Sequence, residues 1–195
     1  MPAPPDPPGL VGPADGGWAA RLERWAAEAR VDAAAETRAR EHSLRRQAEE
    51  EGALAGVLAD LADGRVPVRL HLRAGGPFAG TVRAVGVDVV AVAADGSRGS
   101  VAVVALAAVC SVRTGLEARP VTGDRTVTSS LRLAEVLVGL AADREPVRVV
   151  TADGETVVGV ARSVGQDVVT LRTGPGAAGT AYVPLVAIAA VVVGA

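Results

Sequence analysis

Basic side chains alternate with valine and leucine along one short stretch of the sequence. Arg69, His71 and Arg73 each stand between two aliphatic residues. Successive side chains of a β-strand point to opposite faces, so this stretch predicts a strand with one cationic and one apolar face. Guanidinium groups arranged in this way bind phosphate oxygens. The candidate nucleic-acid-binding residues are therefore Arg69, His71, Arg73, Arg83 and Arg98.

A second interpretation of the same arginines is structural. The chain contains no lysine, so arginine is the only strong cation that can keep a surface solvated. A strand face that is simply exposed to solvent would carry the same pattern. Few aromatic side chains are present on which unpaired bases could stack, which weighs against binding of single-stranded nucleic acid. The sequence therefore leaves both a phosphate-binding face and a solvent-facing strand open.

Catalytic and metal-binding patterns are missing from the sequence. His42 and His71 share no motif with Cys110, the only cysteine, or with paired carboxylates, so no metal site is predicted. No nucleophile, base and orienting group can be assembled, and no glycine cluster leads into Lys-Ser or Lys-Thr. We therefore expect a protein that is not an enzyme and needs no cofactor. Cys110 lies in an apolar run, which predicts a buried thiol.

The composition is biased and its charges are segregated. Hydrophobic residues make up 49% of the chain but aromatic residues only 2%, and lysine and asparagine are absent, a bias typical of a GC-rich genome. Residues 1–64 hold seven arginines and twelve acidic residues, whereas residues 65–113 hold six arginines and two aspartates. The acidic and basic charges therefore lie in different segments of the chain.

The N-terminal part predicts a tail and a helical arm. Residues 1–16 hold six prolines and predict a disordered tail, and residues 17–52 predict a helix. Trp18, Leu22 and Trp25 recur at helical spacing and form one apolar stripe, followed by a mostly charged stretch. We predict this stripe as a partner-docking face.

The rest of the chain is duplicated. Pro67-Val68-Arg69 recurs as Pro146-Val147-Arg148, and the same offset aligns further leucines, valines, glycines and aspartates without a gap. In each copy, apolar residues at helical spacing precede short strand-like segments separated by glycine turns. These patterns predict an α+β, mainly β fold, with copy 1 at residues 53–116, a linker at 117–129 and copy 2 at 130–195.

Copy 2 resembles the Sm-like family in its Hfq-type form. The segments PVRVVTADGETVVGVARSVGQDVVTL and YVPLVAIAAV are similar to the family's first motif and to its last two strands. The resemblance implies two tandem five-stranded barrels, each preceded by a short helix, and ring-type or edge-to-edge assembly. Among the family's base-binding positions only Gln166 matches, which adds it to the candidate nucleic-acid contacts.

Two functions follow as expectations. One is a non-enzymatic interaction or oligomerisation module whose partner is itself, either as a homo-oligomer or by pairing of the two copies within one chain. The alternative is an RNA-binding regulatory protein that uses the basic face of copy 1. The start of the chain has no signal-peptide pattern and no apolar run is long enough to span a bilayer, so we predict a cytoplasmic protein without membrane contact.

Overall fold

The computed structural model describes residues 16–95, 99–174 and 179–194. The predicted tail lies almost wholly outside the described residues, as does Arg98. The chain divides into two compact units, Met1–Arg46 and Gln47–Ala195. Each unit is considered by itself below.

One long helix, α1 (Gly16–Glu50), supplies the described part of the first unit, and its last residues, from Gln47 on, belong to the second unit. Its charged side chains point to solvent and form ladders along the helix, such as the ion pair between Arg40 and Glu36 at 3.3 Å. Several arginines also donate to the carbonyl four residues earlier, as Arg30 does to Ala26. A helix of 35 residues with such pairs needs little packing along its polar stretch.

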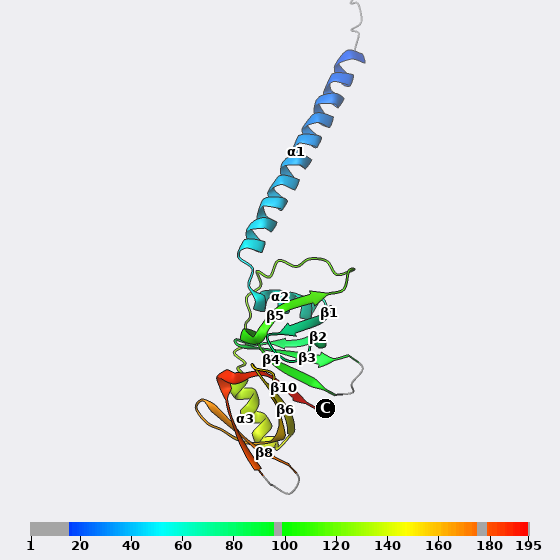
Figure 1. Ribbon diagram of the computed structural model, residues 1–195. Helices are drawn as coiled ribbons and strands as arrows, with labels where there is room; N and C mark the ends of the chain where they lie inside the picture. Colours follow the sequence, from blue (N-terminus) through cyan, green and yellow to red (C-terminus); the bar gives the residue numbers. More distant parts are fainter. Residues whose placement is uncertain (1–15, 96–98, 175–178, 195) are drawn as a thin grey trace, which may run out of the picture. The chain divides into compact units, whose positions relative to one another are not determined.

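The second unit is built from two helices and ten strands (Figure 1). Its first half contains α2 (Leu54–Asp63), β1 (Pro67–Leu72), β2 (Phe78–Val85), β3 (Val89–Ala94), β4 (Val101–Ala105), the 3-10 turn η1 (Leu106–Ala108) and β5 (Val109–Thr114). Its second half contains α3 (Leu133–Asp143), β6 (Pro146–Thr151), β7 (Thr156–Val164), β8 (Val168–Thr173), β9 (Gly179–Pro184), η2 (Leu185–Ala187) and β10 (Ile188–Val193).

The ten strands form one antiparallel sheet in the order β5-β1-β2-β3-β4-β10-β6-β7-β8-β9. This sheet is open, so the predicted pair of separate five-stranded Sm-like barrels is wrong. The physical reason lies at β4, whose second edge is taken by β10 of the other half, with Val191 opposite Val103. Among the described residues β5 pairs only with β1, so no strand contact there closes the first half on itself.

The duplication seen in the sequence recurs in the elements. The offset that separates Pro67 from Pro146 also places α2 on α3, β1 on β6, β3 on β8 and β5 on β10, and each pair begins at corresponding residues. Gly80 shows why the pattern needs glycine within the second strand, because a Cβ there would lie 1.9 Å from the carbonyl oxygen of Ala93.

Two apolar clusters hold the sheet unit together, and each takes residues from both halves. The first surrounds Leu58 of α2 and includes Val150, Ala190 and Val192 from the second half. The second surrounds Leu137 of α3 and includes residues of the first half, among them Val89. The two halves therefore share their cores and are expected to unfold together.

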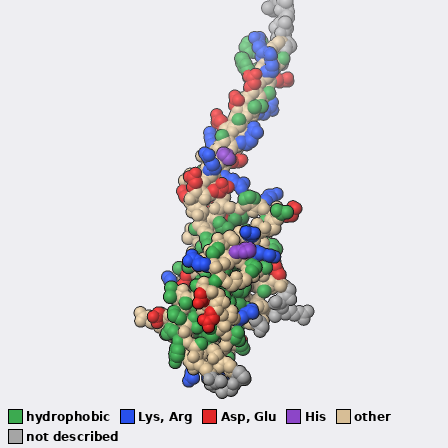
Figure 2. All heavy atoms as spheres, viewed as in Figure 1, with side chains coloured by type: hydrophobic (Ala, Val, Ile, Leu, Met, Phe, Trp, Pro, Cys, Tyr) green, Lys and Arg blue, Asp and Glu red, His purple; other side chains and the backbone are tan. Residues whose placement is uncertain are grey.

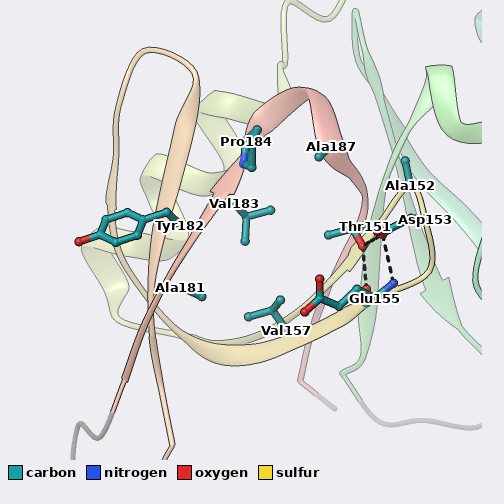
Figure 3. Close-up of a pocket in the computed structure, with 10 residues that line it drawn as sticks. All are labelled: Thr151, Ala152, Asp153, Glu155, Val157, Ala181, Tyr182, Val183, Pro184 and Ala187. Atoms are coloured by element: carbon teal, nitrogen blue, oxygen red, sulfur yellow. Dashed lines mark hydrogen bonds between the residues drawn. The ribbon is translucent and has the colours of Figure 1, made fainter.

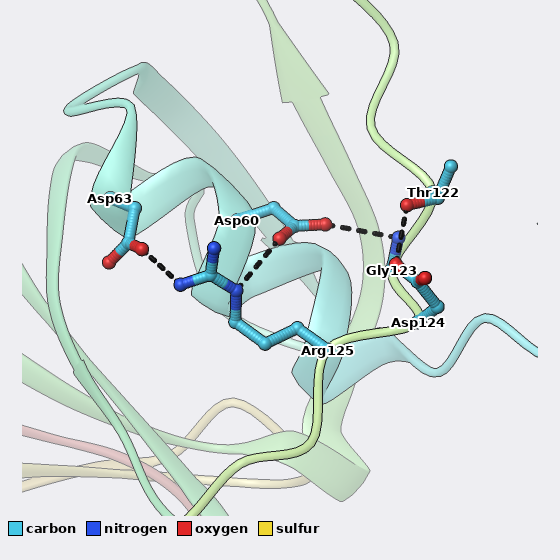
Figure 4. A network of polar contacts seen from close by, with 6 residues as sticks. All are labelled: Asp60, Asp63, Thr122, Gly123, Asp124 and Arg125. Atoms are coloured by element: carbon cyan, nitrogen blue, oxygen red, sulfur yellow. Dashed lines mark hydrogen bonds and ion pairs between the residues drawn. The ribbon is translucent and has the colours of Figure 1, made fainter. Parts of the chain in front are cut away.

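The segment between β5 and α3 has no helix or strand and is fastened to α2 (Figure 4). Arg125 forms ion pairs with Asp63 and with Asp60, the latter at 3.1 Å. The backbone N–H of Gly123 donates to Asp60 at 3.1 Å, and the Gly123 carbonyl accepts from the N–H of Ala53. The aspartates beside Arg125 raise the pKa of its guanidinium, mainly through the hydrogen bond to Asp63.

Candidate interaction surfaces at the two sheet edges

The two terminal strands of the sheet each have only one neighbour in the described chain. β5 pairs only with β1, and β9 pairs only with β8. A strand with one unpaired side presents a row of backbone donors and acceptors that another strand can bind. These two edges are the candidate interaction surfaces.

The pairing of β4 with β10 shows how corresponding edges of this sheet fit together. β4 occupies the same place in the first half as β9 does in the second, and β10 corresponds to β5. At this junction the side chains of Val150, Ala190 and Val192 enter the apolar cluster of the first half. In the described sheet, the β4 edge is therefore paired with the β10 edge. The corresponding edges, those of β9 and β5, lie at the two ends of the sheet and are unpaired.

The β5 edge carries polar side chains where the internal junction is apolar. His71, Ser111 and Arg113 stand at the positions that correspond to Val150, Ala190 and Val192. The register places Arg113 opposite Arg69 and Ser111 opposite His71, so these four side chains share one face. The Nε2 atom of His71 is buried and has no hydrogen-bond partner among the described residues. Such an atom in a folded protein calls for an explanation.

The β9 edge borders an open hollow of about 540 Å³ (Figure 3). Its wall includes Thr151, Val157, Ala181 and Val183, which correspond to Leu72, Phe78, Ala102 and Val104 of the first half. In the first half those four residues belong to or pack on the cluster that receives Val150, Ala190 and Val192. The hollow in the second half therefore corresponds to the place in the first half that Val150, Ala190 and Val192 fill.

Two acidic residues and one aromatic residue line this hollow. Asp153 and Glu155 come from the turn between β6 and β7, and Tyr182 lies on β9 with 70% of its surface exposed. Figure 3 shows Val183 pointing into the hollow and the Tyr182 ring pointing away from it. The hydrogen bond from the Thr151 hydroxyl, and then the bond from the Glu155 backbone N–H, lower the pKa of Asp153. The rim is therefore negatively charged at neutral pH.

The two edges differ in charge. Figure 2 shows basic side chains gathered around a histidine on the first half, and acidic side chains on the second half below them. The β5 edge carries Arg69 and Arg113 on one face, and Asp153 and Glu155 line the hollow beside β9. Opposite charges on two surfaces favour their encounter in the correct orientation.

The predicted nucleic-acid residues are only partly brought together. Arg69 and His71 lie on the same face of β1, while Arg83 lies on β2 and is exposed. Arg73 follows β1 and lines a separate hollow at the junction of the two halves, and exposed Gln166 lies before β8.

Several residues of the edges were missed by the sequence prediction. Arg113 and Ser111 were not identified, although comparison of the two copies marks them as polar where the second copy has valine and alanine. Cys110 was predicted to be buried but is exposed, because β5 is a terminal strand. Tyr182, which the sequence favours as a partly buried cap on a barrel, is exposed instead, because β9 has only one neighbour among the described strands.

Asp88 joins the two halves through a helix end. Its carboxylate accepts the backbone N–H of Leu133, the first residue of α3, at 2.9 Å. A carboxylate at a helix N-terminus satisfies a free donor and interacts favourably with the helix dipole. Its counterpart in the second half, Asp167, is exposed and makes no side-chain hydrogen bond among the described residues.

Asp88→Ala is therefore expected to lower the free energy of unfolding of the sheet unit by about 1 kcal/mol, the usual contribution of such a cap. Asp167→Ala, the matched control, should change it by less than about 0.5 kcal/mol, as an exposed surface substitution does. Urea unfolding followed by circular dichroism measures both values. Equal losses for the two variants would contradict the assigned role of Asp88.

Two further kinds of feature are absent from the described part of the chain. No three His, Cys, Asp or Glu side chains gather there as metal ligands, and no described helix is long and apolar enough to cross a membrane. Comparison with known proteins found no matching family model, no similar curated protein and no similar solved structure.

Proposed function

We propose that this chain is a non-enzymatic, cytoplasmic association module whose partner is a second copy of itself. The β5 edge of one copy binds the β9 edge and its hollow on the next. The observation that carries this proposal is the correspondence between the hollow beside β9 and the site in the first half that receives Val150, Ala190 and Val192. Both ends of the sheet then repeat the contact made inside it.

The register of β4 and β10 supplies the expected register between copies. Ala190 lies opposite Val104 and Val192 lies opposite Ala102 in the internal junction. When these pairs are transferred to the corresponding residues of the other half, Ser111 of one copy would lie opposite Val183 of the next, and Arg113 opposite Ala181. This contact joins unlike surfaces, so it continues from copy to copy until a ring closes or a filament forms.

Charge and burial support the same pairing. In the internal junction a Cβ on Gly75 would lie 3.1 Å from the Val150 side chain, so Val150 lies close to the β1–β2 turn. The counterpart of Val150 is His71, and the counterpart of that turn is flanked by Asp153 and Glu155. The partnerless Nε2 atom of His71 would thus meet acidic groups of the next copy.

The polar composition of the edges indicates that the association is reversible. The internal junction places valine and alanine in the shared core, whereas the free edge presents Ser111 and Arg113. Charged side chains on a terminal strand limit uncontrolled strand pairing. The expected complex therefore depends on concentration and on salt.

Light scattering on the full chain over a range of concentrations tests the proposal. Arg113→Glu and Glu155→Arg are each expected to raise the self-dissociation constant about tenfold, which corresponds to about 1.4 kcal/mol. The double variant should regain part of the affinity. Arg162→Glu and Glu145→Arg are exposed controls away from the two edges and should leave the mass unchanged. A wild-type chain that stays monomeric at all concentrations would refute the function.

RNA binding by the basic face stays a prediction, and the same variants test it. Titration of the wild type and Arg113→Glu with single-stranded RNA at two salt concentrations separates the two functions. Salt-sensitive RNA binding by a chain whose mass never exceeds that of a monomer would favour the RNA function over self-association.

A further inference from the structure

The N-terminal half of α1 carries large apolar side chains that the first unit leaves exposed. Trp18, Leu22 and Trp25 have 57%, 57% and 56% of their surfaces exposed. The two tryptophan rings pack edge to face with centroids 6.4 Å apart, and the Arg21 guanidinium lies 4.4 Å from the centroid of the Trp18 ring. These side chains form one continuous apolar strip along a single helix face.

The spacing of this strip is that of a short coiled-coil seam. Trp18, Leu22, Trp25 and Ala29 follow one another by four, three and four residues, the spacing of heptad core positions. The next two positions of the series hold Asp32 and Glu36, which end the apolar seam. The seam is thus four layers long and has a defined end.

We propose that this seam pairs with the same seam of a second copy of the chain, with the two helices antiparallel. In that orientation Trp18 of one copy lies opposite Ala29 of the other, and Leu22 lies opposite Trp25. Every layer then combines a larger with a smaller side chain, which fills the seam evenly. A parallel pair would stack Trp18 on Trp18 and Trp25 on Trp25, and would leave Ala29 facing Ala29.

The charges beside the seam select the same orientation. Arg21 and Glu28 occupy the equivalent flanking position in successive heptads. In an antiparallel pair these positions face each other, so Arg21 of each copy meets Glu28 of the other and two ion pairs form. In a parallel pair the same residues would face Ala26 and Ala33, which carry no charge. Size and charge therefore favour the antiparallel arrangement independently.

Intrinsic fluorescence reports this seam without a label, because Trp18 and Trp25 are the only tryptophans in the chain. The emission of the full chain is expected to shift to shorter wavelength as its concentration rises, since pairing removes both rings from water. Leu22→Glu should abolish the shift. Emission that stays at the wavelength of exposed tryptophan at every concentration would overturn the proposal.

Charge exchange tests the orientation. Glu28→Arg is expected to raise the concentration at the midpoint of the shift about tenfold, and adding Arg21→Glu should restore it. Glu23→Arg, which lies off the seam on the same helix, is the matched control and should leave the midpoint unchanged. Circular dichroism of each variant checks that α1 remains helical. A double variant that associates no better than Glu28→Arg alone would contradict the antiparallel orientation.

This pairing is separate from the association of the sheet edges, and the two can be tested apart. Arg113→Glu should weaken edge association and leave the fluorescence shift intact, whereas Leu22→Glu should do the reverse. Loss of both effects in either single variant would mean that the two contacts are not independent, and would overturn the seam as a site in its own right.

Discussion

Gly56→Ala is expected to lower the free energy of unfolding of the sheet unit by about 3 kcal/mol, near the top of the range for overpacking a tight site. A Cβ at this position would lie 2.0 Å from the carbonyl oxygen of Gly123 and 2.9 Å from that of Arg125. Both neighbours are backbone atoms, so relief requires the linker to move away from α2. That movement would break the hydrogen bond from Ala53 to Gly123 and disturb the contacts of Asp60.

Gly139→Ala is the matched control, because Gly139 also lies within a helix but has no atom within 4 Å of an added Cβ. Alanine has the higher helix propensity, so this variant should raise the free energy of unfolding by about 0.5–1 kcal/mol. Urea unfolding followed by circular dichroism gives both values. If Gly56→Ala were as stable as the wild type, the packing of the linker on α2 would be wrong.

Leu137→Ala is expected to lower the free energy of unfolding by about 2–5 kcal/mol, the range for removing a buried leucine side chain. Leu137 is fully buried in the cluster formed by α3, the strands of the second half, and Val89 and Val103 of the first half. Few aromatic residues are present in this chain, so each leucine at a cluster centre supplies a large share of the buried apolar area.

Leu58→Ala makes the corresponding change in the first half, where Leu58 is also fully buried. Both variants should show one cooperative thermal transition at a lower temperature, because the clusters share residues across the β4–β10 junction. Calorimetry and hydrogen exchange measure this directly. A second transition, with one half unfolding while the other keeps its melting temperature, would contradict the shared core.

The same junction predicts that the proposed association between copies is weaker than the pairing of β4 with β10 inside the chain. Inside the chain, β10 brings Ala190 and Val192 into an apolar cluster, and the connection between the halves keeps the two edges close together. Between copies, Ser111 and Arg113 replace those side chains, and no covalent link holds the edges together. The balance between single and associated copies should therefore depend on protein concentration.

Much of the local structure could be predicted from the sequence. The spacing of Leu54, Val57, Leu58 and Leu61 predicts α2, and the alternation around Arg69 predicts β1; both elements are present. The constant offset between the two copies predicted that every element of the repeat would occur twice. These predictions succeed because helix and strand periodicities are local, and because a duplicated sequence repeats the same local preferences.

The pairing of strands across the two halves was decided by tertiary structure alone. Nothing local distinguishes a β4 that closes its own half from a β4 that accepts β10, since both leave the alternation of valine and alanine unchanged. The same holds for the exposure of Cys110 and Tyr182 and for the tight contact at Gly56.

The sequence by itself therefore determined the long helix, the repeated unit and the strand that carries Arg69 and His71. The helix and the strand follow from local spacing of apolar residues, and the repeated unit follows from the similarity of the two copies. Tertiary structure decided that the sheet is open and which edges remain unpaired. The reason is physical: strand partners are chosen by long-range hydrogen bonding and shared burial, and residues far apart along the chain, such as Val103 and Val191, carry no local sign of their contact.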